Sequence, residues 1–302
     1  MGYITGFLIC GIKDQTDINK VGCMVKNFFL HKIIRPIIAL CVSAHFLTGF
    51  ILGSWIAAIT SHDGRLVDGA LAGVVVLCAT SSTFIKNDIC DLQSDSVDKP
   101  YRPIAAGNLK IQTAKTFSNA LLILACTISI ICWLFETRWK LLLLYIALCF
   151  TYNRIKYIFS KIKGFYVALC LAFPLFFGLE IGSLNNLRTT IITITFCVYI
   201  AHREILLDIR DIKGDSLKGV QTIAVKYGTG TAENVSWILW SISTYLICMC
   251  ANYDTISLVC VFFYMYSSGL SLYLHKYIKH RRFASTLFQW FPMVFLGVIM
   301  FR

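Results

Sequence analysis

Two short windows of the sequence, 87–98 and 204–215, hold half of its sixteen acidic residues. A ligand set made of carboxylate oxygens, without His or Cys, suits a hard cation such as Mg²⁺ or Ca²⁺, and Mg²⁺ usually combines one or two carboxylates with substrate phosphates. The windows therefore indicate a metal-dependent site for a phosphorylated substrate. Their acids are Asp88, Asp91, Asp95 and Asp98, and Glu204, Asp208, Asp211 and Asp215.

The two windows repeat one another. The pattern Asp-Ile-x-Asp-x-x-x-Asp-Ser begins at Asp88 and returns at Asp208, an offset of 120 residues at every matched position. Such a repeat indicates an internal duplication, here of a unit about four membrane spans long. Because four is an even number, both windows are expected on the same face of the membrane, opposite each other across one cavity.

Each window is expected to continue an apolar helix, with its acids on one side at about 100° per residue. Pro100 and Pro103 are expected to end the first helix. Two carboxylate sets facing one space suit two Mg²⁺ ions that clamp a diphosphate. The simpler alternative is that the acids only cap helix ends through salt bridges, although capping requires no repeat. The basic residues available for it are Lys86, Lys99, Arg203 and Arg210.

The composition defines the elements that must carry these windows. Hydrophobic residues make up 57% of the 302 residues and charged residues 15%, so the chain is predicted to be an all-α integral membrane protein. We predict nine transmembrane helices around a central, lipid-facing cavity. The nine apolar stretches are about 36–60, 68–85, 117–135, 140–152, 165–183, 189–207, 234–251, 255–274 and 284–301.

The net charge of +12 could indicate a nucleic-acid-binding protein, but the position of the basic residues argues against it. Five loops that share one face of a nine-span chain hold 23 of the 28 lysines and arginines. The positive-inside rule places this face, with both aspartate windows, in the cytoplasm. Residues 1–35 are expected to form a cytoplasmic or interfacial segment before a single transmembrane domain, 36–302.

At these residues the sequence resembles the UbiA superfamily of intramembrane prenyltransferases. Asn87-Asp88-x-x-Asp91-x-x-x-Asp95 is similar to the family's first aspartate-rich motif, and the second window is similar to its second motif. The resemblance covers residues 35 to about 230. The further matching segments are Arg35-Pro36, Arg102-Pro103-Ile104-Ala-Ala-Gly107 and Tyr152-x-x-x-Lys156, the last placed in the loop between the fourth and fifth spans.

The resemblance implies Mg²⁺ dependence, with two ions, and transfer of a polyprenyl chain from a diphosphate to an aromatic or other lipophilic acceptor. It also implies roles for individual residues. For Lys156 and Arg102 the alternative is ordinary positive-inside charge. The implied metal ligands are Asn87, Asp91, Asp211 and Asp215; the supporting catalytic acids are Asp88, Asp95 and Asp208; the diphosphate-binding residues are Lys156, Arg102 and Tyr152.

Some features bear on the choice of acceptor. Tyr157 stands where the family often has Arg, and Phe165 stands where many members have Asn. The segment Arg203–Asp211 looks more like the branch that makes archaeal-type ether lipids than like the 4-hydroxybenzoate branch. We expect departure of the diphosphate to produce an allylic carbocation. An apolar cavity is then expected to protect this carbocation from water until the acceptor attacks it.

Three other functions fit parts of this pattern. The carbocation could instead be captured by its own double bonds, which would make the protein a terpene cyclase. A non-catalytic membrane scaffold could keep the fold and bind a prenyl lipid. Intramembrane acids can also mark a cation pathway, but a transporter would spread them across the membrane depth, whereas these acids lie at one face.

Overall fold

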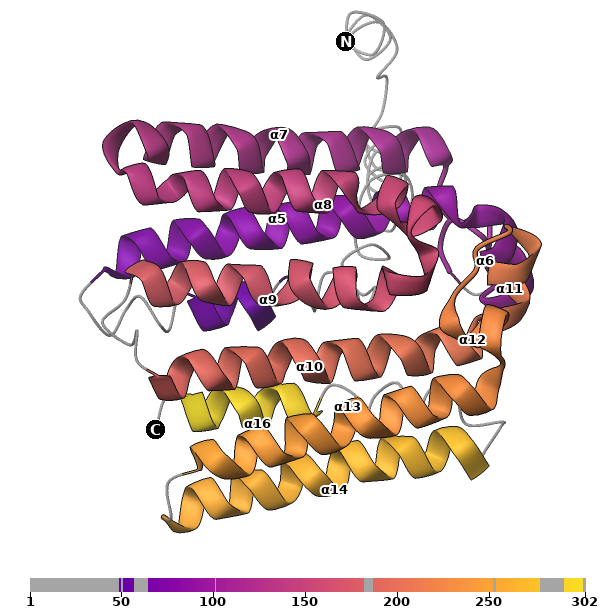
Figure 1. Cartoon of the computed structure of the whole chain (residues 1–302). Helices are drawn as coiled ribbons and strands as arrows, with labels where there is room; N and C mark the ends of the chain where they lie inside the picture. The colour runs from indigo at the N-terminus through magenta and orange to yellow at the C-terminus, as the bar shows by residue number, and fades with distance from the viewer. Residues whose placement is uncertain are drawn as a thin grey trace, which may run out of the picture.

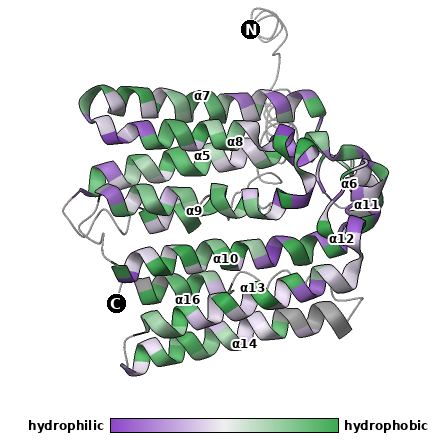
Figure 2. Ribbon diagram, viewed as in Figure 1, coloured by the Kyte–Doolittle hydropathy of each residue, from purple (hydrophilic) through white to green (hydrophobic). Residues whose placement is uncertain are grey.

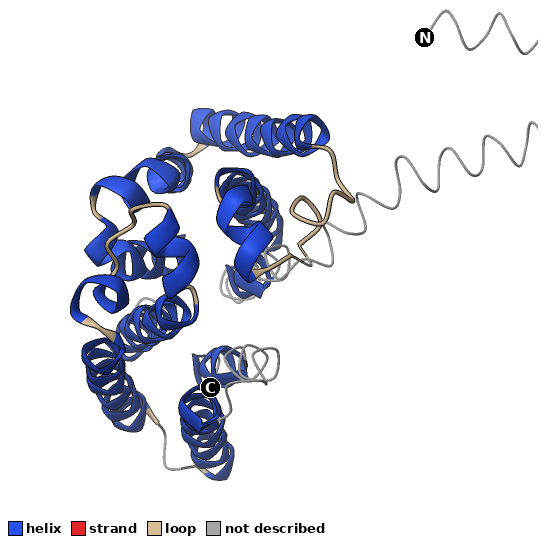
Figure 3. Cartoon of the chain, turned by 90° about the vertical axis from the view of Figure 1, so that its right-hand side faces the viewer, coloured by secondary structure: helices blue, strands red, loops and turns tan. Residues whose placement is uncertain are grey.

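The computed structural model describes residues 49, 51–56, 65–100, 102–181, 187–251, 254–277 and 291–300. Every regular element in these ranges is a helix, which confirms the predicted all-α class (Figure 3). Residues 1–48, including Arg35 and the expected interfacial segment 1–35, lie outside the described residues.

Long helices lie side by side, and the short helices gather at one end of the bundle (Figure 1). The chain leaves α5 and α10 at this same end, so the two aspartate windows come together there. The long helices are α5 (Leu66–Cys90), α7 (Ile111–Phe135), α8 (Lys140–Ile158), α9 (Lys163–Ile181), α10 (Leu187–Arg210), α13 (Thr229–Cys250), α14 (Thr255–Tyr277) and α16 (Phe291–Met300). The short ones are α6 (Leu92–Asp98), α11 (Ile212–Leu217) and α12 (Ile223–Tyr227), with 3₁₀ turns η2 (Thr137–Trp139) and η3 (Ser160–Ile162).

Five helical segments are long and apolar enough to cross a membrane: Leu66–Cys90, Ile111–Phe135, Thr137–Ile158, Ser160–Glu180 and Leu187–Arg210. They correspond to the second to sixth predicted spans, and Figure 2 shows that most of their residues are hydrophobic. Helices α13 and α14 follow the seventh and eighth predicted spans. The first and ninth fall partly outside the described residues, so nine crossings and the four-span duplication stay predictions.

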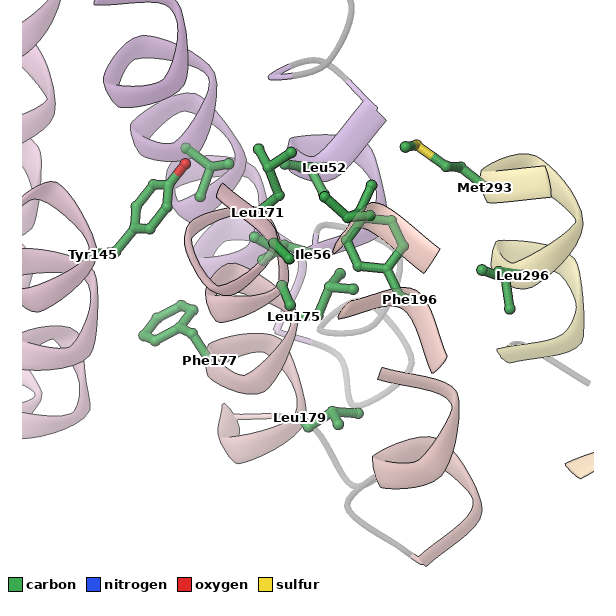
Figure 4. Packing of buried hydrophobic residues seen from close by; sticks show 14 of the residues in the cluster. Leu52, Ile56, Tyr145, Leu171, Leu175, Phe177, Leu179, Phe196, Met293 and Leu296 are labelled. Carbon is green, nitrogen blue, oxygen red and sulfur yellow. The ribbon is translucent and has the colours of Figure 1, made fainter. Parts of the chain in front are cut away.

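The apolar core lies between the long helices, where Leu171, Leu175 and Phe196 meet Leu52 and Ile56 from the helical residues 51–56 (Figure 4). Lipid tails are as apolar as leucine, so helices in a membrane associate through close packing rather than through the hydrophobic effect.

Two glycines provide such packing where residues 51–56 cross α5. A Cβ added to Gly53 would lie 2.7 Å from the carbonyl oxygen of Gly73, and one added to Gly73 would lie 2.8 Å from that of Gly53. The two backbones are therefore in direct contact, which any side chain at either position would prevent.

The expectation that each aspartate window continues one helix is wrong. Helix α5 ends before Asp91 and α10 ends before Asp211, and a short helix follows each break. The backbone angles are alike, with φ −90° and ψ 3° at Asp91 and φ −95° and ψ 9° at Asp211. The amide of Asp91 still donates to Asn87 and that of Asp95 to Asp91, so the break bends the chain without ending its hydrogen-bond ladder.

A second expectation is also wrong, because Tyr152 and Lys156 lie within α8 and not in a loop. The fourth span was expected to end at residue 152, where polar residues begin, but the helix continues to Ile158. A backbone at the membrane surface keeps its helical hydrogen bonds even where its side chains become polar. Only Phe159 and η3 then separate α8 from α9.

Candidate active site

The first aspartate cluster surrounds the break between α5 and α6. Lys156, on the last turns of α8, donates to the Oδ1 atoms of Asn87 at 2.8 Å and of Asp91 at 2.5 Å. Lys218 also donates to Oδ1 of Asp91. Burial by itself would raise the pKa of Asp91, but the two lysines outweigh it and hold the pKa below its ordinary value. Asp91 therefore stays ionised.

Arg102 binds the other two acids of this cluster. Its Nη1 donates to Oδ1 of Asp88 and to Oδ2 of Asp95, both at 2.7 Å, and so ties the loop after α6 back to α5. Burial raises the pKa of Asp95 in spite of Arg102. Burial lowers the pKa of Arg102, but Asp88 and Asp95 reverse this effect and raise it. Arg102 is thus a cation shared between two carboxylates.

The second cluster surrounds the break between α10 and α11. Asp211 accepts from Lys99 at 2.5 Å and from Nε of its neighbour Arg210 at 2.9 Å. Although burial would raise the pKa of Asp211, Arg210 and Lys99 hold it well below its ordinary value. This acid therefore stays ionised, as Asp91 does in the first cluster.

Lys163, the first residue of α9, serves the remaining two acids of the second cluster. Its Nζ lies 2.6 Å from Oδ1 of Asp208 and 3.5 Å from Oδ2 of Asp215. Burial raises the pKa of Asp215, with Lys163 acting against this effect. Gly164 permits the position of α9, because a Cβ there would lie 3.2 Å from Cβ of Glu204 on α10.

The donor atoms fit a hard cation. The ammonium group of Lys156 is held by one amide oxygen and one carboxylate oxygen, a combination that also suits Mg²⁺. In the part of the chain that the structure describes, no three His, Cys, Asp or Glu side chains converge on one point. A Mg²⁺ ion here would use one or two carboxylates and take its other oxygens from substrate and water, which is its usual mode.

Tyr152 differs from the other predicted site residues, because it borders an apolar pocket between α5, α8 and α9. Its ring stacks on Tyr166, with centroids 6.4 Å apart and planes 12° from parallel. The pocket has a volume of about 30 Å³, far below the roughly 300 Å³ or more of a ligand pocket, so its own apolar side chains nearly fill it. They are Thr80, Thr83, Phe84, Tyr145, Cys149, Tyr152, Val167, Cys170 and Leu171.

Sequence reasoning missed the part that lysines play. Lys163 and Lys218 were not singled out, and Lys99 was considered only as a helix cap. The available signal was their position: Lys99 and Lys218 each follow an aspartate motif within a few residues, and Lys163 precedes the fifth span. The alternative interpretation, in which basic residues form salt bridges with the acids at the helix ends, is correct in part, because Lys99 and Arg210 pair with Asp211.

The two residues that depart from the family pattern lie near this end of the bundle. The ring centroid of Tyr157 is 5.3 Å from Nζ of Lys156, which is close enough for a cation–π contact. Phe165 is exposed on the first turn of α9.

A bundle of apolar helices that ends in a compact set of paired acids and cations is the arrangement expected of an enzyme embedded in the membrane. Comparison of the chain with known proteins identifies its family. The model of the UbiA prenyltransferase family matches residues 46–299, which is most of the chain. The chain therefore belongs to the UbiA prenyltransferase family, and it is a membrane prenyltransferase.

Two relatives are digeranylgeranylglyceryl phosphate synthases. The chain is 32% identical over 207 residues to that of Saccharolobus solfataricus, which covers 66% of this chain and 71% of the relative. It is 33% identical over 167 residues to that of Sulfolobus acidocaldarius, which covers 55% of this chain and 58% of the relative.

Solved structures share the fold. A UbiA homologue from Aeropyrum pernix K1 in its apo form has a TM-score of 0.68 at 16% identity, covering 85% of this chain and 97% of that one. A UbiA homologue from Archaeoglobus fulgidus, described as bound to GPP and Mg²⁺, has a TM-score of 0.57 at 16% identity, covering 89% and 96%.

Proposed function

We propose that this enzyme transfers the prenyl group of a polyprenyl diphosphate to a separate lipophilic acceptor in a Mg²⁺-dependent reaction. The observation that carries the proposal is the meeting of two aspartate clusters at one end of an apolar bundle, where Lys99 and Lys218 connect them. Neighbours with the same fold are described as bound to DMAPP or GPP with Mg²⁺, which supports this choice of donor.

In this proposal, each half of the chain supplies two of the metal ligands. Mg²⁺ when bound, as two ions, would neutralise the diphosphate and so favour its departure. Asp88, Asp95 and Asp208 support the metal ligands, since Arg102 and Lys163 fix their carboxylates. The metal ligands are Asn87 and Asp91 on one side and Asp211 and Asp215 on the other.

Lys156, Arg102 and Tyr152 are proposed to hold the diphosphate. The side chain of Lys156 is 4% exposed, so its charge is little screened by water and would act strongly on a phosphate oxygen. Arg102 has its Nη1 committed to two aspartates, but a guanidinium has five N–H donors, which leaves donors for the diphosphate.

The prenyl chain is proposed to extend from the diphosphate into the apolar space that begins at Tyr152. This space excludes water, which would otherwise capture the allylic carbocation formed when the carbon–oxygen bond to the diphosphate breaks. Because the pocket now holds only about 30 Å³, side chains such as Phe84 and Tyr145 have to move when the chain enters. The acceptor then attacks the carbocation and loses its proton.

For the acceptor we propose a glyceryl phosphate lipid, with geranylgeranyl diphosphate as the donor. The support is the name of the relatives, digeranylgeranylglyceryl phosphate synthase, which describes a product with two geranylgeranyl groups on glyceryl phosphate. This acceptor is lipophilic but not aromatic, and it agrees with the likeness of Arg203–Asp211 to the branch that makes archaeal-type ether lipids. We also propose that the end of the bundle with the aspartates faces the cytoplasm, in keeping with the concentration of basic residues there.

The test is a product assay with purified protein, Mg²⁺ and geranylgeranyl diphosphate, analysed by mass spectrometry. Geranylgeranylglyceryl phosphate and an aromatic acceptor are supplied in separate reactions, with Asp91→Asn as the inactive control. We expect a doubly prenylated glyceryl phosphate only in the first reaction. Transfer to the aromatic acceptor alone would overturn the acceptor class, and a cyclic product formed at full rate without any acceptor would overturn transfer itself.

A further inference from the structure

Two lysines each follow one aspartate motif but form an ion pair with an aspartate of the other cluster. Lys99 follows the first motif, yet its Nζ binds Oδ2 of Asp211 in the second cluster at 2.5 Å. Lys218 follows the second motif, yet it binds Oδ1 of Asp91 in the first. Asp91 and Asp211 are equivalent positions of the sequence repeat. Each half of the enzyme thus supplies a cation to the same aspartate of the other half.

The two lysines occupy matching places in the backbone. Lys99 is the C-cap of α6, where its amide donates to the carbonyl oxygen of Asp95. Lys218 is the C-cap of α11, where its amide donates to that of Asp215. The helices α6 and α11 lie against each other, and the lysine side chains are only 12% and 10% exposed. The contact between these short helices therefore places each lysine beside the aspartate of the other cluster.

An ammonium group and a metal ion compete for the same carboxylate oxygens. Oδ1 of Asp91 already accepts from both Lys156 and Lys218, and the two oxygens of Asp211 accept from Arg210 and Lys99. A metal ion that arrives alone has to displace a lysine, which then lies beside a second cation without an anionic partner. A metal ion that arrives with diphosphate brings phosphate oxygens to which the displaced lysine can donate.

We infer that Lys99 and Lys218 are positioning residues that hold Asp211 and Asp91 in the absence of substrate and move to the diphosphate when it enters with its metal. The inference rests on the proposed use of a metal and a diphosphate at this site. Its consequence is that the enzyme binds Mg²⁺ weakly alone and more tightly together with diphosphate. The two ligands bind cooperatively because the same lysines oppose one and favour the other.

The test is isothermal titration calorimetry of the full chain in detergent, with Mg²⁺ alone and with pyrophosphate in the presence of Mg²⁺. Lys218→Gln removes one competitor for Asp91, so its Kd for Mg²⁺ alone should fall about 10- to 100-fold, the scale of one hydrogen bond to a charged group. Its Kd for pyrophosphate should rise by a similar factor. Lys99→Gln should behave in the same way, whereas Lys213→Gln, an exposed lysine on α11, should change neither value.

An unchanged or weaker affinity for Mg²⁺ alone in both variants would overturn the inference, because the lysines would not be competitors. Unchanged affinity for pyrophosphate in both variants would equally overturn the inference, because the lysines would not move to the diphosphate. Lys218→Arg keeps the cation and should retain near-normal values, which separates loss of charge from misfolding. If no prenyl transfer were found with any acceptor while Mg²⁺ binding still tightened in Lys218→Gln, the proposed function would fail and the competition would stand.

Discussion

Replacing Lys163 by Met is expected to destabilise the enzyme strongly. The lysine side chain is 11% exposed, and its partners Asp208 and Asp215 are 7% and 11% exposed, so the charges are poorly solvated. At an effective dielectric constant of about 20, attraction across 2.6 Å amounts to about 6 kcal/mol. Desolvation of the pair offsets part of this, and breaking a buried pair by removing one partner costs about 3–5 kcal/mol.

This loss corresponds to a decrease in Tm of about 5–8 °C, because an unfolding entropy of about 2.1 cal/mol/K per residue over 302 residues gives roughly 1.6 °C per kcal/mol. The assay is thermal unfolding of the purified protein in detergent, without Mg²⁺ or substrate. Lys161→Gln is the matched control, because Lys161 is an exposed lysine two residues away. Adding Asp208→Asn to Lys163→Met should recover about half of the loss, since one unpaired carboxylate is removed.

A decrease of less than about 2 °C in Lys163→Met would refute this reasoning, because the pair would then be solvated or dispensable. Failure of the double variant to recover any stability would show that the side chain of Lys163 acts through packing and not through its charge.

Three further predictions concern the reaction and its orientation. Asp91→Asn or Asp211→Asn should lower turnover by more than about 10²-fold at saturating Mg²⁺, the scale of losing one electrostatic stabiliser. The variants should still unfold cooperatively, at a lower Tm because the basic partners of each aspartate lose their anion; near-normal turnover in either variant would exclude a metal site shared by both clusters. Single cysteines at the exposed positions Ser96 and Ser216, in a cysteine-depleted background, should react with an impermeant thiol reagent from the same side of sealed vesicles, and labelling from opposite sides would contradict one shared site. Without an acceptor, geranylgeranyl diphosphate should be hydrolysed only slowly to its alcohol, as measured by mass spectrometry of the products. Rapid formation of a cyclic hydrocarbon in the same reaction would identify the protein as a cyclase.

The parts of the fold that could be predicted are those that the membrane imposes. A helix that crosses the membrane needs about 20 consecutive, mostly apolar residues, so α5, α7, α9 and α10 are evident from hydropathy alone. The end of α8 is not, because Asn153, Arg154 and Lys156 look like a loop when read in sequence. Lys156 is nevertheless 3% exposed, since Asn87 and Asp91 neutralise and bind it.

The aspartates of the site could be predicted because their repeat is exact, whereas their cationic partners could not. Lys99 and Lys163 lie among many basic residues that the positive-inside rule already explains. Their position beside a motif or a span is a weak signal, because a lysine that reaches across to Asp211 and one that faces water can both occupy such a position. That distinction depends on how α6 lies against α11, which is a tertiary contact between segments more than 100 residues apart.

The matching bends at Asp91 and Asp211 constrain how this protein can change during evolution. Each residue added to or removed from a helix rotates all that follows by about 100°, so a single insertion in α6 or α11 would turn Asp95 or Asp215 away from its partners. Substitutions at exposed positions such as Gln93 carry no such penalty. The length of chain from Asn87 to Asp95, and from Asp208 to Asp215, should therefore stay fixed in functional descendants while the surface residues within it vary freely.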